Sequence, residues 1–122
     1  MAMRYRPVKY RCGRQYARAK ETGGYRSKAE HAYAAELDMR VRAGDIRAWM
    51  YEPCNWRLGA NCYYRPDFLV IHLDGLLEFV EVKSGNILER ARVKFAAAAE
   101  KYPWFQWTIA RRKGKSWTHE HA

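Results

Sequence analysis

The sequence predicts one α/β domain with the element order α-β-β-β-α-β. Two segments have the apolar spacing of amphipathic helices, and strand-like segments lie between and after them. Asp74-Gly75, between two of these strand-like segments, is typical of a hairpin turn. The 122 residues, 48% of them hydrophobic, are enough to bury a single core. We therefore expect a basic N-terminal arm (1–24), a folded domain (25–110) and a basic C-terminal tail (111–122).

The first helix is predicted to begin at Ser27 and to end near Ala43, with Gly44 as its C-cap. Its apolar stripe consists of Tyr33, Ala34, Leu37 and Val41. At about 100° per residue, Glu30 falls in the middle of this stripe. Because a surface helix normally has an apolar residue at such a position, a carboxylate there needs a physical reason.

Three strands are predicted between the two helices. Residues 46–51 form the first strand, which Pro53 ends or confines to a sheet edge, and residues 55–58 are a candidate continuation. Gly59-Ala60-Asn61 has the composition of a turn. Residues 63–72 and 76–83 then form the two strands of the hairpin.

The second helix is predicted from about Leu88 to Lys101, ahead of Pro103. Its apolar stripe consists of Leu88, Ala91, Phe95, Ala98 and Tyr102. A last strand is expected over 104–110, in which Trp104 and Trp107 serve packing. The basic tail after this strand is expected to fray.

The register of the hairpin decides whether its polar residues can meet. Glu81 and Lys83 share one face, because side chains alternate along a strand. A two-residue loop at Asp74-Gly75 would place Asp67 and Glu81 on opposite faces of the sheet.

A three-residue loop, with Gly75 in the left-handed conformation of a bulge, would instead pair His72 with Leu76. Continued along the strands, this register pairs Asp67 with Glu81. We predict this register, or an equivalent bulge elsewhere in the hairpin. We also expect the first helix to pack on the face that carries Leu69, Ile71, Leu77 and Phe79.

The formal net charge of +10 favours a polyanionic partner, and nucleic acid is the simplest one. Basic residues are concentrated at the start of the chain and again near its end. The candidate nucleic-acid-binding residues are Arg4, Arg6, Lys9, Arg11, Arg14, Arg18, Arg26, Lys28, Lys94, Arg111, Arg112 and Lys113.

Other site classes find less support in the sequence. Cys12, Cys54 and Cys62 lack the paired spacing of a zinc site, and the four histidines lack the spacing of an HNH or zinc-hydrolase site. No apolar run has the length of a membrane span, and none resembles a signal peptide. We expect reduced thiols in a cytoplasmic protein that has no contact with a membrane.

Three carboxylates and one lysine are the candidate active site. Glu30, Asp67 and Glu81 offer the oxygen ligands that Mg²⁺ prefers, and the Val82 carbonyl is a further candidate ligand. Bound Mg²⁺ would polarise a phosphate and lower the pKa of a bound water. Lys83 would orient or deprotonate that water, or stabilise charge that develops on the phosphate.

Each of these motifs also has a purely structural explanation. Ser27 and Glu30 fit a capping box, in which the glutamate reaches back to the N-cap amide. Glu81 and Lys83 fit an exposed ion pair on a strand, and Pro-Asp is common in turns. Their coincidence in one hairpin of a strongly basic chain favours the catalytic interpretation.

The combined motifs resemble the PD-(D/E)XK nuclease superfamily, and within it the bacteriophage endonuclease I family of Holliday-junction-resolving enzymes and related short phage nucleases. The residues that carry the resemblance are Tyr25-Arg26-Ser27-x-x-Glu30, Tyr64-x-Pro66-Asp67-Phe68-Leu69, Phe79-Val80-Glu81-x-Lys83 and Glu100-Lys101-Tyr102-Pro103. They cover about 25–110. The basic arm before Tyr25 and residues 56–61 have no counterpart in the family pattern.

The resemblance implies a restriction-endonuclease-like core, with a mixed central sheet flanked by helices. It implies Mg²⁺-dependent hydrolysis of phosphodiesters, with Mn²⁺ able to substitute, by a set that matches Glu30, Asp67, Glu81 and Lys83. It also implies branched DNA as the partner, a homodimer, and the host cytoplasm as the location if the chain is phage-encoded.

Two alternatives stay open at this point. One is a nonenzymatic, basic nucleic-acid-binding protein in which the acidic residues form ion pairs. The other keeps the chemistry but changes the target, as in a nicking, repair or restriction nuclease. The first alternative does not explain a carboxylate on the apolar stripe of a helix.

Overall fold

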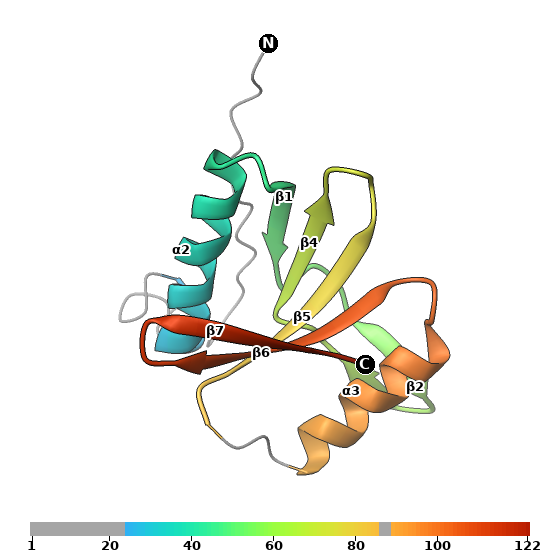
Figure 1. Cartoon of the computed structure of the whole chain (residues 1–122). Helices are drawn as coiled ribbons and strands as arrows, with labels where there is room; N and C mark the ends of the chain where they lie inside the picture. Colours follow the sequence, from blue (N-terminus) through green and yellow to red (C-terminus); the bar gives the residue numbers. More distant parts are fainter. Residues whose placement is uncertain (1–23, 86–88) are drawn as a thin grey trace.

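The computed structural model describes residues 24–85 and 89–122. In this part of the chain two helices accompany a five-stranded sheet and a two-stranded sheet, which confirms the predicted α/β class (Figure 1). The elements are α2 (Lys28–Arg42), β1 (Ile46–Tyr51), β2 (Trp56–Gly59), β3 (Cys62–Tyr64), β4 (Phe68–His72), β5 (Leu77–Lys83), α3 (Glu89–Lys101), β6 (Gln106–Lys113) and β7 (Ser116–His121). The candidate DNA contacts Arg4, Arg6, Lys9, Arg11, Arg14 and Arg18, and the predicted helix residue Leu88, lie outside the described residues.

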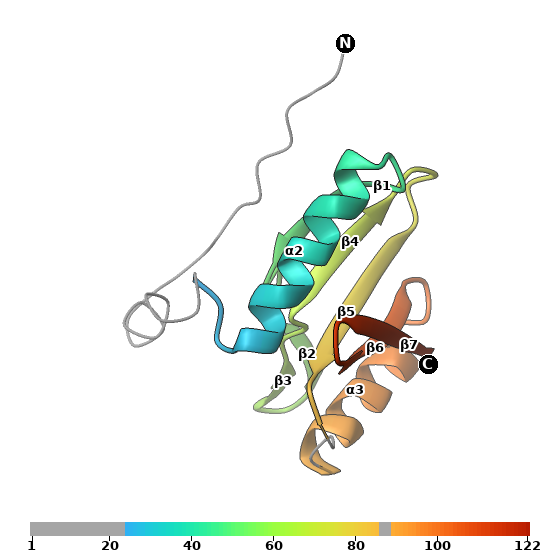
Figure 2. The same ribbon diagram turned by 60° about the vertical axis from the view of Figure 1, so that its left-hand side comes forward.

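The larger sheet is mixed and has the strand order β1-β4-β5-β6-β7. Strands β5 and β6 are parallel, and the chain passes between them through α3. The other neighbouring strands pair in antiparallel fashion. Among the described residues, strands β2 and β3 form a separate two-stranded sheet beside α3 (Figure 2).

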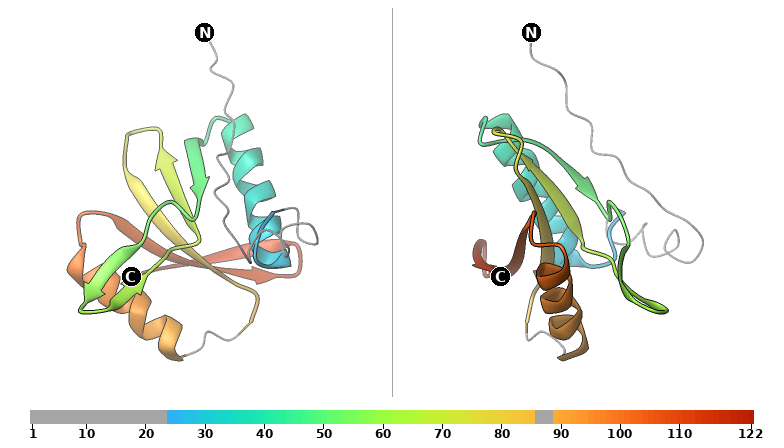
Figure 3. Two further views of the ribbon diagram at one scale, coloured as in Figure 1. Left: turned by 180° about the vertical axis from the view of Figure 1, so that it is seen from behind. Right: turned by 90° about the vertical axis from the view of Figure 1, so that its right-hand side faces the viewer.

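The two helices pack on opposite faces of the larger sheet (Figures 2 and 3). Helix α2 buries Tyr33 and Leu37 in one cluster with Phe68 and Val80. Helix α3 buries Phe95 and Ala98 in a second cluster with Phe79. Phe79 and Val80 are neighbours on β5, so their side chains point to opposite faces of the sheet. The face that carries Leu69 and Phe79 therefore belongs to α3, and the prediction that the first helix packs there is wrong.

Local sequence explains where α2 begins and ends. Ser27 is the N-cap in an extended conformation, and its Oγ accepts a hydrogen bond from the Glu30 N–H at 3.1 Å. Gly44, directly after the C-cap residue Ala43, has φ +79, a value that glycine adopts without the strain of a side chain. The predicted bounds of the first helix are therefore confirmed to within one residue.

The predicted register of the hairpin is confirmed. Phe68 pairs with Val80, and His72 donates its N–H to the Leu76 carbonyl at 2.9 Å. Gly75 has φ +92, as the three-residue loop requires. The same register, continued by one residue beyond Phe68, places Asp67 opposite Glu81.

The predicted strand 63–72 is wrong as a single element. Strand β3 ends at Tyr64 and belongs to the small sheet, whereas β4 begins at Phe68 in the large sheet. Pro66 lies between them, fully buried. Proline has no backbone N–H and cannot donate a hydrogen bond to a neighbouring strand. The regular strand is therefore interrupted at Pro66, where the chain passes from the small sheet to the large one.

The expectation of a frayed tail is also wrong. Strand β6 extends to Lys113 and turns back into β7, so the predicted domain boundary at 110 falls inside a strand. Trp117 packs against Tyr33 of α2 with ring centroids 4.8 Å apart. Trp107 is buried as predicted, but Trp104 is 76% exposed and does not serve the core. Within the described part of the chain, neither helix is long and apolar enough to cross a lipid bilayer.

Candidate active site

The candidate site is centred on Asp67, just before the first residue of β4. The Asp67 N–H donates to the Val80 carbonyl at 3.1 Å, and its Oδ2 accepts from the Val82 N–H at 2.8 Å. Backbone N–H groups of a strand lie close to the plane of the sheet. The Asp67 carboxylate therefore lies near that plane. It accepts the β5 hydrogen bond that a backbone carbonyl would accept if β4 extended further toward its N-terminus.

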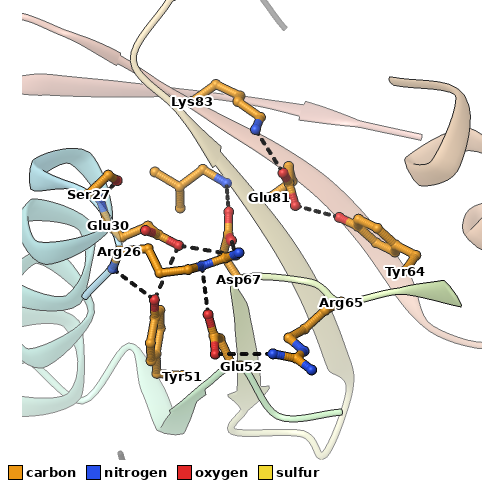
Figure 4. A network of polar contacts seen from close by, with 11 residues as sticks. Arg26, Ser27, Glu30, Tyr51, Glu52, Tyr64, Arg65, Asp67, Glu81 and Lys83 are labelled. Atoms are coloured by element: carbon orange, nitrogen blue, oxygen red, sulfur yellow. Dashed lines mark hydrogen bonds and ion pairs between the residues drawn. The ribbon is translucent and has the colours of Figure 1, made fainter. Parts of the chain in front are cut away.

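Glu30 and Glu81 approach Asp67 from opposite sides of the sheet (Figure 4). Glu30 comes from the first turn of α2, and the Tyr51 hydroxyl donates to its Oε1 at 3.4 Å. Glu81 lies on the α3 side, where the Tyr64 hydroxyl donates to its Oε2 at 2.7 Å. All three acids are at least nine-tenths buried. The structure thus brings the three predicted carboxylates together at the N-terminal end of β4. They do not, however, lie on one face of the sheet.

Lys83 completes the set of four predicted residues. Its Nζ lies 3.0 Å from Glu81 Oε1, and it lines the same cavity as Glu30, Asp67, Glu81 and Val82. This cavity has a volume of about 600 Å³. Two cationic side chains thus contact the three acids directly: Lys83 contacts Glu81, and Arg26 contacts Asp67.

The capping-box explanation for Glu30 holds only in part. The Glu30 N–H bonds to Ser27 Oγ, as in such a box. The Glu30 carboxylate, however, faces Tyr51, Arg26 and Asp67. Its side chain is therefore directed into the site, and the cap does not account for it.

Burial and mutual repulsion raise the pKa of two of the acids. Burial is the largest cause for Asp67, followed by the charge of Glu30 and a hydrogen bond with it, and the pKa rises well above its usual value. The pKa of Glu81 is raised by burial and then by the charge of Asp67, while Tyr64 and Lys83 oppose the rise. Burial and the neighbouring acid thus disfavour the charged form of both groups, and a bound cation would offset this effect.

Arg26 supplies one such cation, and its place in the site differs from the prediction. We expected Arg26 to contact DNA. Instead, its guanidinium lies 3.0 Å from Asp67 Oδ1, 2.7 Å from Glu52 Oε1 and 3.7 Å from Glu30 Oε1. Burial disfavours its charged form, but these three carboxylates outweigh that effect and raise its pKa. With its donors directed at three acids, Arg26 is not available to a phosphate in this arrangement.

Glu52 is a fourth acid of the site that the sequence interpretation missed. Its N–H donates to the Asp67 carbonyl at 2.8 Å, and its φ of 45 is rare for a residue with a side chain. The side chain is 4% exposed. Arg26 Nε is close to Glu52 Oε1, yet no donor among the described residues is aligned with this oxygen for a hydrogen bond. The available signal was a glutamate next to Pro53, where an apolar strand ends.

The rim of the cavity is basic. Arg90 and Lys94, one turn apart on α3, line it together with Arg65. Lys94 was a predicted nucleic-acid contact, and Arg90 was not predicted. Three other predicted contacts, Lys28, Arg112 and Lys113, are exposed but do not line this cavity. Arg111 forms an ion pair with Glu120 at 3.0 Å.

The donor set matches a hard divalent cation in ligand type. The carboxylates of Glu30, Asp67 and Glu81 and the backbone of Val82 line one cavity and offer only oxygen ligands. Within 24–85 and 89–122, however, no three acidic, histidine or cysteine side chains are already grouped as a metal site. Arg26 and Lys83 instead contact the acids directly. A metal at this place would therefore compete with the Arg26–Asp67 and Lys83–Glu81 contacts.

We compared the chain with protein-family models, with curated proteins and with solved structures, and found no match. The assignment of a function therefore depends on the geometry of the site and on the sequence motifs.

Proposed function

We propose that this protein is a Mg²⁺-dependent endodeoxyribonuclease with a restriction-endonuclease-like core of the PD-(D/E)XK type. We propose branched DNA, such as a Holliday junction, as its substrate. The observation that carries the proposal is the burial of Glu30, Asp67 and Glu81 around one cavity that also contains Lys83. Buried like charges cost stability, so their presence favours a functional role.

Each residue has a role that follows from its contacts. Asp67 and Glu81, with Glu30 and the Val82 carbonyl, would hold Mg²⁺, and Mn²⁺ would substitute for it. When bound, the ion supplies polarisation of the phosphate and a lowered pKa for a coordinated water. The hydrogen bond from Tyr64 orients Glu81. Lys83, whose Nζ lies 3.0 Å from Glu81 Oε1, would position the attacking water or donate to a phosphate oxygen.

The basic residues of the rim support DNA as the partner. Arg90 and Lys94 lie on the first two turns of α3 and line the cavity that contains the acids. Contacts of this kind with phosphates position a duplex without reading its sequence. The preference for junctions and a homodimeric state follow from the resemblance to the phage enzymes, and both are part of the proposal. Light scattering of the purified protein measures the oligomeric state.

The test compares cleavage of a synthetic four-way junction, a linear duplex and a supercoiled plasmid, in Mg²⁺, in Mn²⁺ and in EDTA. Asp67→Asn keeps an acceptor for the Val82 N–H but removes the charge. We expect metal-dependent cleavage that falls by more than about a hundredfold in this variant, because metal sites of this class need the carboxylate. Asp74→Asn, in the exposed turn at the far end of the hairpin, is the matched control and should cleave normally.

Two other outcomes favour the alternatives. The ion pairs of Arg26 and Lys83 with the acids are also what a nonenzymatic nucleic-acid-binding protein would contain. Salt-sensitive DNA binding that is unchanged in Asp67→Asn, without cleavage in either metal, supports that reading. Cleavage of linear duplex as fast as of the junction supports a nicking, repair or restriction nuclease.

A further inference from the structure

One guanidinium contacts three buried carboxylates at this site. Arg26 lies within ion-pair distance of Glu30, Glu52 and Asp67 (Figure 4). Arg65 adds a longer contact, of 3.7 Å, to Glu52 alone. An isolated ionised carboxylate in a low-dielectric interior is unstable, so Arg26 holds much of this cluster together.

Arg26 and the three acids differ in exposure to solvent. The Arg26 side chain is 40% exposed, whereas the side chains of Glu30, Glu52 and Asp67 are at most 6% exposed. The guanidinium therefore lies on the open side of the acids. The Arg26 N–H donates to the Tyr51 hydroxyl at 3.0 Å, which anchors the backbone. The Arg26 side chain is thus the more exposed partner in each of the three ion pairs.

Glu52 is the carboxylate that could retain the Arg26 side chain if the guanidinium moved away from Asp67. One of its carboxylate oxygens has no aligned donor, although Arg26 Nε lies 2.7 Å away. A rotation of the guanidinium away from Asp67 would give up the 3.0 Å contact with Asp67 but could align a donor with this oxygen of Glu52. The Glu52–Asp67 backbone hydrogen bond keeps the two acids in register during such a movement.

We propose that Arg26 is a displaceable counterion of the metal site. Its guanidinium holds Glu30 and Asp67 together in the metal-free protein and withdraws toward Glu52 when a divalent cation binds. This inference rests on the metal site of the proposed function. Arg26 is accordingly a positioning residue, and Glu52 is the anchor that retains it.

The consequence is a competition between two cations that can be measured. The coupling is reciprocal: if metal weakens the Arg26–Asp67 contact, removal of the guanidinium must strengthen metal binding. Loss of one unit charge next to the acids should tighten the Kd for Mg²⁺ about tenfold or more. The same change should destabilise the metal-free protein, because it leaves the acids unpaired.

The experiment measures Mg²⁺ and Ca²⁺ binding by calorimetry, and Tm in EDTA and in saturating Mg²⁺. It uses the full chain and the variants Arg26→Gln, Arg26→Lys and Arg65→Gln. We expect Arg26→Gln to bind metal more tightly than wild type and to gain more Tm from it. Arg65→Gln is the matched control for metal binding, since it removes the same charge from the same cavity but from a residue paired with Glu52 rather than with Glu30 or Asp67, and its Kd for metal should stay close to that of wild type.

Arg26→Lys keeps the charge but cannot bridge two acids with a planar fork, so it should bind metal with an intermediate Kd. This variant serves if Arg26→Gln does not fold in EDTA, and recovery of folded Arg26→Gln on addition of Mg²⁺ would itself support the proposal. Metal binding by Arg26→Gln that is no tighter than that of wild type overturns the inference. So does an equal gain in Arg65→Gln.

The two proposals fail in different ways. If wild type binds neither Mg²⁺ nor Ca²⁺, the metal site of the proposed function is wrong. If wild type binds metal and Arg26→Gln binds it equally, only the displacement of Arg26 is wrong.

Discussion

At the residue scale, Asp67 is the group on which the candidate site depends most. Its Oδ1 faces Arg26 at 3.0 Å and its Oδ2 accepts from the Val82 N–H at 2.8 Å. These contacts favour the ionised form, but burial and Glu30 oppose it and raise the pKa overall. The residue is therefore held in place by its hydrogen bonds while its charge is poorly tolerated.

This conflict predicts how stability depends on pH without metal. A folded-state pKa above the unfolded value of about 3.8 means that the folded protein binds more protons between the two values. The free energy of unfolding contributed by Asp67 should therefore fall as pH rises through that interval. In Asp67→Asn, which has no ionisable group at this position, the free energy of unfolding should fall less with rising pH than in wild type. Tm measured in EDTA over a pH series tests this, with Asp74→Asn as control, and an identical pH dependence in Asp67→Asn would contradict it.

At the element scale, the β4–β5 turn sets the position of Asp67 relative to Glu81. Gly75 adopts φ +92 in this turn, and Asp74 Oδ1 accepts from the Leu76 N–H at 2.9 Å. The three-residue loop fixes the register of both strands up to the candidate site. A single backbone conformation at the far end of the hairpin therefore determines which acids meet.

We expect Gly75→Ala to lower the free energy of unfolding by about 1 kcal/mol, because a side chain is strained at positive φ. A Cβ at Gly75 would contact nothing within 4 Å, so the cost is one of backbone conformation alone. Gly59→Ala is the control, since a Cβ there also meets open space and its φ lies outside the positive range. Urea denaturation of both variants measures the difference, and equal stability would refute this account of the turn.

The hairpin register could be predicted from sequence because loop length and glycine position determine it together. The packing of α2 could not, because both faces of the hairpin are apolar: Phe68 and Val80 on one face, Leu69 and Phe79 on the other. Strand β7 was missed because it is polar apart from Trp117 and looks like a tail in the sequence. The contacts of Arg26 with Glu52 and Asp67 join residues far apart in the chain, and no local pattern predicts them.

At the scale of the whole molecule, positive charge is distributed unevenly around the cavity. Arg90 and Lys94 line it, whereas Arg42 and Arg47 do not. If the cavity receives DNA, the first pair should contribute phosphate contacts and the second should not.

The salt dependence of DNA binding tests this distribution. In Arg90→Ala/Lys94→Ala the slope of log K against log salt should become shallower by about 2, one unit for each lost phosphate contact. Arg42→Ala/Arg47→Ala changes the net charge equally and should leave the slope nearly unchanged. Fluorescence anisotropy with a labelled junction in EDTA measures both. An equal effect of the two pairs would place the DNA elsewhere on the surface.

Both helices begin at the cavity: Ser27 caps α2 there, and Arg90 and Ala91 belong to the first turn of α3. The N-terminal end of a helix carries a partial positive charge, which arises from aligned peptide dipoles. An anionic backbone that enters this space would meet the positive poles of two dipoles before it reaches the acids. If a nucleic acid binds in this cavity, part of the attraction for its phosphates would arise from the main chain, and side-chain substitution could not remove that part.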